Sequence, residues 1–234
     1  MMDTPRIVEV RRNILKRNDE IARRLRDRFR AAGVYVMSLV SSPGSGKTAL
    51  LEKTLASLNR QYRAAALVGD LATENDAARL RRSGALVKQI TTGTVCHLDA
   101  AMIETALHEW PLTGLDFLFI ENVGNLVCPS SFDLGENRRV VLLSVTEGDD
   151  KPLKYPTIFQ SADLALITKL DLAHAADFRF DDLERNIHSV APEMPALCVS
   201  SKTDQGFDAW LQQLVDGRAR AIAADSNAAI APFR

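Results

Sequence analysis

The stretch Ser41-Ser42-Pro43-Gly44-Ser45-Gly46-Lys47-Thr48 decides the fold that this sequence predicts. It follows an apolar run, Val34–Val40, and leads into a helical pattern over Thr48–Arg60. A strand, a glycine-rich turn and a helix in that order form a phosphate-binding loop, because backbone N–H groups and the helix N-terminus then point at an anion. The pattern G-x-x-x-x-G-K-[ST] is matched except that Ser41 replaces its first glycine.

The side chains of this stretch have distinct expected roles. Gly44 and Gly46 allow the backbone to approach phosphate closely. Lys47 is expected to reach the β- and γ-phosphate oxygens of a nucleotide, and Thr48 to hold Mg²⁺ through its hydroxyl. The alternative is a glycine-rich turn with an incidental lysine, which the flanking strand and helix disfavour. The predicted nucleotide-binding residues here are Ser42, Gly44, Ser45, Gly46, Lys47, Thr48 and Ala49.

Apolar runs and helical patterns alternate along the rest of the chain. The runs are continuously apolar, as in strands of a parallel sheet that is covered on both faces. We therefore expect the α/β class: a single P-loop NTPase domain with a mostly parallel sheet and helices on both faces. The predicted strands are Val34–Val40, Ala64–Gly69, Leu86–Ile90, Phe117–Ile120, Val140–Val145, Leu164–Thr168 and Ala196–Ser200. The predicted helices are Pro5–Ala32, Thr48–Arg60, Glu74–Ser83, Leu98–Glu109, Phe180–Ser189 and Phe207–Ile222.

The two ends of the chain differ from the central domain. Residues 1–33 are predicted to form a basic helix that packs on the domain, with a solvated face rather than a phosphate-binding one. Residues 34–224 form the P-loop domain in this interpretation. Residues 225–234 are small and polar and are expected to be a flexible tail.

The bulk composition argues against several classes of protein. A net charge of −1 provides no field that would attract nucleic acid or a membrane surface. No apolar run approaches the roughly 20 residues that span a bilayer, and no signal peptide is evident, so the expected location is the cytoplasm. Cys96, Cys128 and Cys198 are an odd number of cysteines, which argues against a disulfide framework.

Two acidic residues, Asp70 and Glu121, fall at the carboxyl ends of predicted strands, where such sheets bind their ligands. Mg²⁺ prefers hard oxygen ligands, so Thr48, Asp70 and Glu121 form the predicted magnesium site. Asp70 is also a candidate to orient the attacking water, and Gly124 has the spacing at which a backbone N–H meets a γ-phosphate. The predicted catalytic residues are Lys47, Asp70, Glu121 and Gly124. A helix-capping Asp or a solvated Glu is the alternative for either residue alone.

The sequence Thr168-Lys169-Leu170-Asp171 resembles the [NT]-K-x-D motif with which GTPases recognise guanine. The Asp171 carboxylate can accept from the N1–H and the 2-amino group of guanine, and adenine offers neither donor in that place. Lys169 is expected to pack its aliphatic stem along the base, whereas Thr168 stands where Asn is commoner, which leaves one contact open. The stretch Ser200-Ser201-Lys202 follows the last predicted strand and matches the loop that covers the base. These residues complete the nucleotide-binding set and indicate GTP.

A thiol and an imidazole stand side by side at Cys96 and His97, and Cys128 follows shortly after Gly124. Thiolate and imidazole suit Zn²⁺ or Ni²⁺ far better than Mg²⁺. Three ligands do not complete a tetrahedral site, but a partner related by two-fold symmetry could complete it. A buried structural thiol is the alternative for Cys96 and Cys128, and it is the preferred interpretation of Cys198. Because Gly124 and Cys128 lie on one loop, we expect nucleotide state and metal affinity to be coupled.

Four segments together resemble the HypB family of hydrogenase nickel-incorporation GTPases. They are Leu39–Thr48, Thr92–Ala100, Ile120–Gly135 and Ser144–Pro156. The resemblance runs from about residue 7 to residue 222 and makes Ser41 the expected residue of the phosphate loop. It implies a SIMIBI-class GTPase that forms a homodimer face to face across its nucleotides. It also implies a Ni²⁺ or Zn²⁺ site at the dimer interface, which maps here onto Cys96, His97 and Cys128.

The resemblance implies a function and partners as well. The function is slow hydrolysis of GTP to GDP and phosphate, coupled to delivery of nickel to [NiFe]-hydrogenase large-subunit precursors together with the accessory protein HypA. Some members carry a histidine-rich or cysteine-rich N-terminal segment, but no His or Cys precedes Cys96 here, so nickel storage is not expected. One alternative is a GTPase that gates maturation of another metalloenzyme, a urease or a cobalamin enzyme, with structural cysteines. Another is a passive metal-binding scaffold with vestigial hydrolysis.

Overall fold

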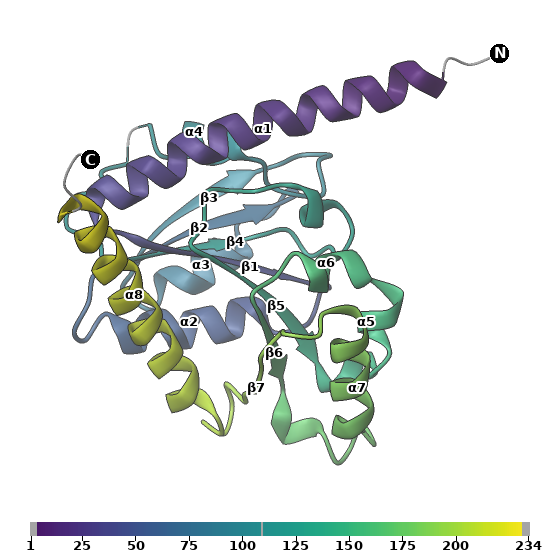
Figure 1. Cartoon of the computed structure of the whole chain (residues 1–234). Helices are drawn as coiled ribbons and strands as arrows, with labels where there is room; N and C mark the ends of the chain where they lie inside the picture. The colour runs from purple at the N-terminus through teal and green to yellow at the C-terminus, as the bar shows by residue number, and fades with distance from the viewer. Residues whose placement is uncertain (1–3, 109, 231–234) are drawn as a thin grey trace.

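Seven parallel strands form the central sheet of the computed structural model, which describes residues 4–108 and 110–230 (Figure 1). The strands lie in the order β3-β2-β4-β1-β5-β6-β7. Every strand pair is parallel, so the predicted α/β class with a mostly parallel sheet is confirmed. The strands are β1 (Tyr35–Ser41), β2 (Ala64–Asp70), β3 (Leu86–Thr91), β4 (Phe117–Glu121), β5 (Arg138–Ser144), β6 (Leu164–Thr168) and β7 (Ala196–Cys198).

Helices cover both faces of this sheet, as predicted (Figure 1). One face packs against α2, α3 and α8. On the other face, α1 and α4 cover β1, β2 and β4, while α6 and α7 cover β5 and β6. The helices of the described residues are α1 (Thr4–Ala32), α2 (Lys47–Leu58), α3 (Asn75–Arg81), α4 (Ala100–Ala106), α5 (Lys151–Lys154), α6 (Pro156–Gln160), α7 (Phe180–Val190) and α8 (Phe207–Ile230). Single 3₁₀ turns occur at Cys128–Ser131, Val145–Glu147 and Leu170–Leu172.

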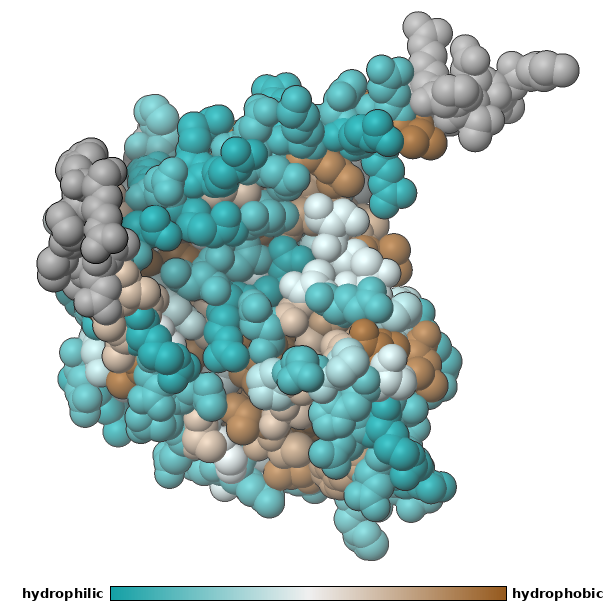
Figure 2. Space-filling view, in the orientation of Figure 1, coloured by the Kyte–Doolittle hydropathy of each residue, from teal (hydrophilic) through white to brown (hydrophobic). Residues whose placement is uncertain are grey.

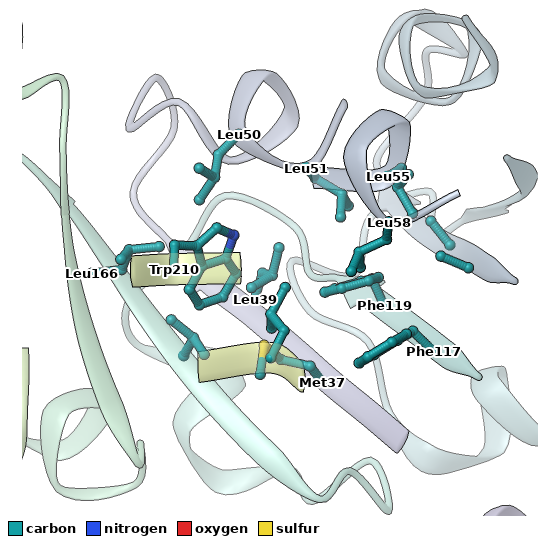
Figure 3. Close-up of a cluster of buried hydrophobic side chains, with 14 of the residues drawn as sticks. Met37, Leu39, Leu50, Leu51, Leu55, Leu58, Phe117, Phe119, Leu166 and Trp210 are labelled. Carbon is teal, nitrogen blue, oxygen red and sulfur yellow. The ribbon is translucent and has the colours of Figure 1, made fainter. Parts of the chain in front are cut away.

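Layers of apolar side chains separate the sheet from its helices, because successive strand residues point to opposite faces. In β4, Phe119 packs in the layer that contains α2, and Ile120 packs in the layer that contains α1 and α4. Figure 3 shows the first of these layers, with Trp210 of α8 among leucines of α2. The same alternation continues past the apolar part of β4. It sends the next two residues, Glu121 and Asn122, to opposite sides of the sheet, where they bond α2 and the segment before α4.

Helix α1 packs on the domain through its C-terminal half, while its N-terminal half extends beyond the sheet (Figure 1). Four residues at helical spacing are buried there: Ile21, Ala22, Leu25 and Phe29. Arg26 pairs with Asp133 at 2.7 Å, and Arg28 donates to the Leu107 carbonyl at 2.8 Å, so part of the basic face contacts the domain. Figure 2 shows that the rest of the helix surface in this view is mostly hydrophilic. None of the described helices is both long and apolar enough to cross a membrane.

The structure differs from the sequence-based element boundaries in a few places. The sequence predicts a last helix that ends at Ile222, whereas α8 continues to Ile230. Residues 225–230 of the predicted tail are therefore helical, and residues 231–234 lie outside the described residues. Helix α4 begins at Ala100 instead of Leu98, because the Asp99 side chain caps it by accepting from the Met102 N–H at 2.8 Å. The sequence does not predict the short helices α5 and α6, because proline usually interrupts a helix. In both helices the proline lies in the first turn, where it is tolerated.

Candidate nucleotide and metal site

The phosphate loop between β1 and α2 is assembled around the buried ammonium of Lys47. Gly44 and Gly46 have φ angles of 76° and 92°, in the left-handed region that glycine tolerates. Lys47 Nζ donates to Ser41 Oγ at 2.9 Å, and the Ser45 hydroxyl donates to the same oxygen. Burial lowers the pKa of Lys47. Ser41 therefore positions the lysine through its hydroxyl, a contact that the glycine of the general motif could not make.

Glu121 lies beneath the start of α2 and is almost fully buried. Its Oε1 accepts from Thr48 Oγ1 at 2.7 Å, and burial raises its pKa to about 7 against the opposing effect of Lys47. The other carboxylate oxygen, Oε2, is buried and has no hydrogen-bond partner in the described part of the chain. A buried carboxylate oxygen without a donor is costly unless a cation or its water shell neutralises it. Thr48 and Glu121 therefore fit a Mg²⁺ ion.

The other two predicted catalytic residues lie at the same sheet edge but differ in their surroundings. Asp70 Oδ1 accepts the N–H groups of Ala72 and Thr73 at 2.9 and 3.0 Å. Burial acts to raise the Asp70 pKa, but the bonds from Thr73 and Ala72 outweigh it and hold that pKa below its usual range. Gly124 instead lies against the phosphate loop, since a Cβ there would come within 3.0 Å of the Pro43 Cα. The structure thus places Gly124 against the phosphate loop, and the catalytic roles of Gly124 and Asp70 both stay predictions.

Thr168 and Lys169, at the end of β6, bind the phosphate loop directly. Thr168 Oγ1 donates to the Ser45 carbonyl at 2.6 Å. Lys169 adopts the left-handed region with φ at 57°, and its Nζ donates to the Gly44 carbonyl at 2.6 Å. The hydroxyl of Thr168 therefore supplies a link to the phosphate loop at the position where Asn is commoner in the general motif.

Asp171 is oriented by the loop that follows β7. Its Oδ1 accepts from Ser200 Oγ at 2.6 Å, and Ser200 Oγ accepts the N–H groups of Lys202 and Thr203 at 3.2 Å each. Ser201 contributes its carbonyl, which accepts from Lys53 Nζ of α2 at 2.9 Å. Predicted residues from two distant segments thus meet beside the first turns of α2, which also contain Ala49. The contact with Ser200 orients the Asp171 carboxylate, and its binding of guanine stays a prediction.

Cys96, His97 and Cys128 come together although 32 residues separate the two cysteines. Their ligand atoms all lie within 4.8 Å of one another, and the two Sγ atoms are 2.9 Å apart. The His97 ring stacks on Phe132 with centroids 4.0 Å apart, and its Nδ1 is buried with no hydrogen-bond partner among the described residues. Burial lowers the pKa of His97, which favours the neutral imidazole that binds a metal. Three ligands leave a tetrahedral site incomplete.

Sequence reasoning does not single out Arg139, although this residue holds the loop that carries Cys128. Arg139 is 7% exposed, and its guanidinium donates to carbonyls within residues 129–132 at 2.6–3.4 Å. It also pairs with the buried Glu136 at 2.9 Å. The signal in the sequence is the pair of arginines, Arg138 and Arg139, that precedes the apolar run of β5.

Residues 35–198 match the model of the CobW/HypB/UreG nucleotide-binding domain. The chain belongs to this family. Several proteins named hydrogenase maturation factor HypB are similar to this chain. HypB of Azotobacter chroococcum mcd 1 is 48% identical over 208 residues, which are 88% of this chain and 68% of the relative. The Escherichia coli (strain K12) HypB is 47% identical over 213 residues, or 91% and 73%. The hydrogenase/urease maturation factor HypB of Helicobacter pylori (strain ATCC 700392 / 26695) is 44% identical over 213 residues, or 89% and 87%.

Solved structures give the same result. The crystal structure of HypB from Helicobacter pylori in complex with nickel has a TM-score of 0.82 at 44% identity, over 87% of this chain and 96% of that one. HypB from Archaeoglobus fulgidus has a TM-score of 0.81 at 38% identity, over 87% and 99%. FtsY from Elizabethkingia anophelis with GDP, at 15% identity and a TM-score of 0.52 over 79% of this chain and 63% of that one, shares the fold alone. The predicted fold class and the predicted HypB resemblance are therefore confirmed.

Proposed function

We propose that this chain is a GTP-hydrolysing metallochaperone that binds nickel between two copies of itself and helps to insert it into [NiFe]-hydrogenase precursors. One observation carries the proposal. Cys96, His97 and Cys128 form a three-ligand cluster beside the segment that follows β4, and this segment also contacts the phosphate loop. Hydrogenase maturation by the relatives, and nickel in the Helicobacter pylori HypB structure, support nickel as the cargo. Zn²⁺ suits the same ligands.

The nucleotide side of the proposal follows from charge and hydrogen bonding. Lys47 and the N–H groups of the phosphate loop neutralise the phosphates, and Asp171 selects guanine. Thr48 and Glu121 would hold Mg²⁺, which stabilises charge that develops on the transferred phosphoryl group. Asp70 at the neighbouring strand end positions the attacking water. In this proposal hydrolysis to GDP and phosphate is slow, and its rate sets how long the metal is held.

The metal side requires a second copy of the chain. Each copy provides two thiolates and one imidazole, fewer ligands than a closed tetrahedral site needs. An ion on a two-fold axis would take the same ligands from each of two copies, which would complete the site and give one metal ion per two chains. Loss of the γ-phosphate then releases the Gly124 segment, loosens the homodimer and exposes the metal to HypA and the hydrogenase large-subunit precursor.

Nickel titration of cysteine variants tests this proposal directly. Cys96→Ala and Cys128→Ala should each abolish nickel binding, read by calorimetry or by competition with a chromogenic chelator, and leave GTP affinity near that of the wild type. Cys198→Ala is the matched control, because Cys198 is a partly buried thiol on β7 outside the cluster. Nickel binding at full stoichiometry in both Cys96→Ala and Cys128→Ala would remove the cluster as the cargo site.

Urease maturation is a second candidate function, favoured by one specific observation. The Helicobacter pylori relative that is 44% identical carries the name hydrogenase/urease maturation factor. Expression of this chain in a host that lacks its own HypB and contains both nickel enzymes discriminates the candidates. Recovery of hydrogenase activity alone supports the proposed client, whereas recovery of urease activity alone assigns the second one.

A further inference from the structure

The segment from Glu121 to Cys128 contacts the nucleotide region along one side. Its first residue, Glu121, accepts from Thr48 at 2.7 Å. Further along, Gly124 packs tightly on the phosphate loop, since an added Cβ would lie 3.0 Å from the Pro43 Cα. A change at the phosphate end of the loop therefore displaces this segment instead of being absorbed by intervening side chains.

The same segment contacts the metal region along its other side, through two asparagine carboxamides. Asn122 Oδ1 accepts the Leu98 N–H at 3.0 Å, and Asn125 Nδ2 donates to the Cys96 carbonyl at 3.3 Å. These two bonds bracket His97. The backbone of two of the three metal ligands is thus attached to the segment that ends at the third, Cys128.

Each carboxamide is itself fixed to its own segment. Asn122 is 2% exposed, and its Oδ1 also accepts the Val123 N–H at 2.9 Å. Asn125 Oδ1 accepts the Val127 N–H at 2.8 Å. On the opposite side, Leu98 is fully buried and packs closely on Gly69. A Cβ added to Gly69 would lie 2.8 Å from the Leu98 Cγ. The attachment points are therefore held firmly at both ends.

We propose that Asn122 and Asn125 are positioning residues that transmit the nucleotide state to the metal ligands. Residues 96–98 move with the Gly124 segment because the two carboxamides bind their backbones. Without those bonds, Cys96 and His97 keep one position in both nucleotide states, and only Cys128 responds. This inference rests on the proposed function, and it assigns the coupling to two named side chains outside the three-ligand cluster.

The test compares nickel dissociation constants measured with GDP and with a non-hydrolysable GTP analogue. In the wild type the analogue should give the tighter binding. In Asn122→Ala and in Asn125→Asp the ratio of the two constants should fall toward one, by roughly 2- to 30-fold. Asn125→Asp keeps the acceptor for Val127 and loses the amide donor that bonds the Cys96 carbonyl and the Cys128 thiol, so it remains informative if Asn122→Ala does not fold.

Two controls separate positioning from a general effect on stability. Asn59→Ala removes a comparable bond, from the Ala64 N–H to Asn59 Oδ1 at 2.9 Å, and should leave the ratio unchanged even if the thermal midpoint falls. Asn122→Asp keeps the acceptor oxygen and should restore the ratio.

The outcomes distinguish this inference from the proposed function. A wild-type ratio in both Asn122→Ala and Asn125→Asp overturns the inference and leaves the metallochaperone function standing, provided that the wild type binds nickel through Cys96. Absence of nickel binding by the wild type overturns the proposed function, and the inference with it. Nickel binding through Cys96 with equal constants in both nucleotide states overturns the inference and the nucleotide-driven release step of the proposed function, but it leaves the nickel site itself standing.

Discussion

The nucleotide region and the metal region share one edge of the sheet, yet they are built differently. In the nucleotide region the functional side chains bond one another or nearby backbone, as Lys47 bonds Ser41 and Thr48 bonds Glu121. In the metal region the ligand atoms face one another, and the buried His97 Nδ1 has no partner in the described part of the chain. Apart from Glu121 Oε2, which has no donor among the described residues, the nucleotide region is organised within one chain, whereas the proposed metal site is completed by an ion and a second copy.

The largest expected effect is a loss of stability in the loop that carries Cys128. Arg139→Met leaves Glu136 buried without its partner and removes the donors to the 129–132 carbonyls, so it should lower the free energy of unfolding by about 3–5 kcal/mol. Chemical denaturation measures this change. Arg138→Met on the same strand is the control, because Arg138 is more exposed and its bonds are long, so the expected cost is under about 1 kcal/mol. Equal effects of the two variants would contradict the role given to Arg139.

Lys47→Ala tests whether the nucleotide region depends on its buried cation. Loss of this ammonium should reduce GTP turnover by roughly a hundredfold or more, because it acts on charge that develops at the phosphates. A steady-state phosphate-release assay measures it. Lys88→Ala, in which a lysine of β3 loses its bond to the Ala106 carbonyl, should keep wild-type turnover. Nickel binding by the nucleotide-free protein should survive in Lys47→Ala, and a parallel loss of both functions would erase the distinction between the regions.

Asp171→Asn tests whether the carboxylate selects the base. The substitution replaces an acceptor with a donor, so GTP affinity should fall roughly 10- to 100-fold while affinity for xanthosine triphosphate rises. Competition with a fluorescent nucleotide measures both affinities. An unchanged GTP affinity would remove Asp171 as the guanine-binding residue.

Ser200→Ala gives the smallest expected effect. The carboxylate of Asp171 remains but loses the hydroxyl that orients it, at a cost of about 1 kcal/mol, or roughly fivefold in GTP affinity. Nucleotide preference should stay with guanine, which the same competition assay reads. A shift toward xanthine in this variant would show that orientation, and not the carboxylate itself, selects the base.

The nucleotide region could be predicted from the sequence more fully than the metal region. The phosphate loop and the guanine motif are contiguous and follow apolar strands, so their order along the chain predicts that they meet at one sheet edge. Cys96 and Cys128 could be proposed as partners from their chemistry, but spacing alone cannot show that two loops meet. Asn122, Asn125 and Arg139 act through backbone atoms of distant segments, and an asparagine or arginine in a loop carries no signal of such contacts.

We propose that nucleotide state and metal binding are coupled through assembly of two chains. Titration of nickel in the presence of GDP and of a non-hydrolysable GTP analogue, with molecular mass measured in the same samples, tests it most directly. We expect one tightly bound nickel ion per two chains in a dimer with the analogue, and weaker binding with GDP. One nickel ion per monomer, with equal affinity in both nucleotide states, would contradict it.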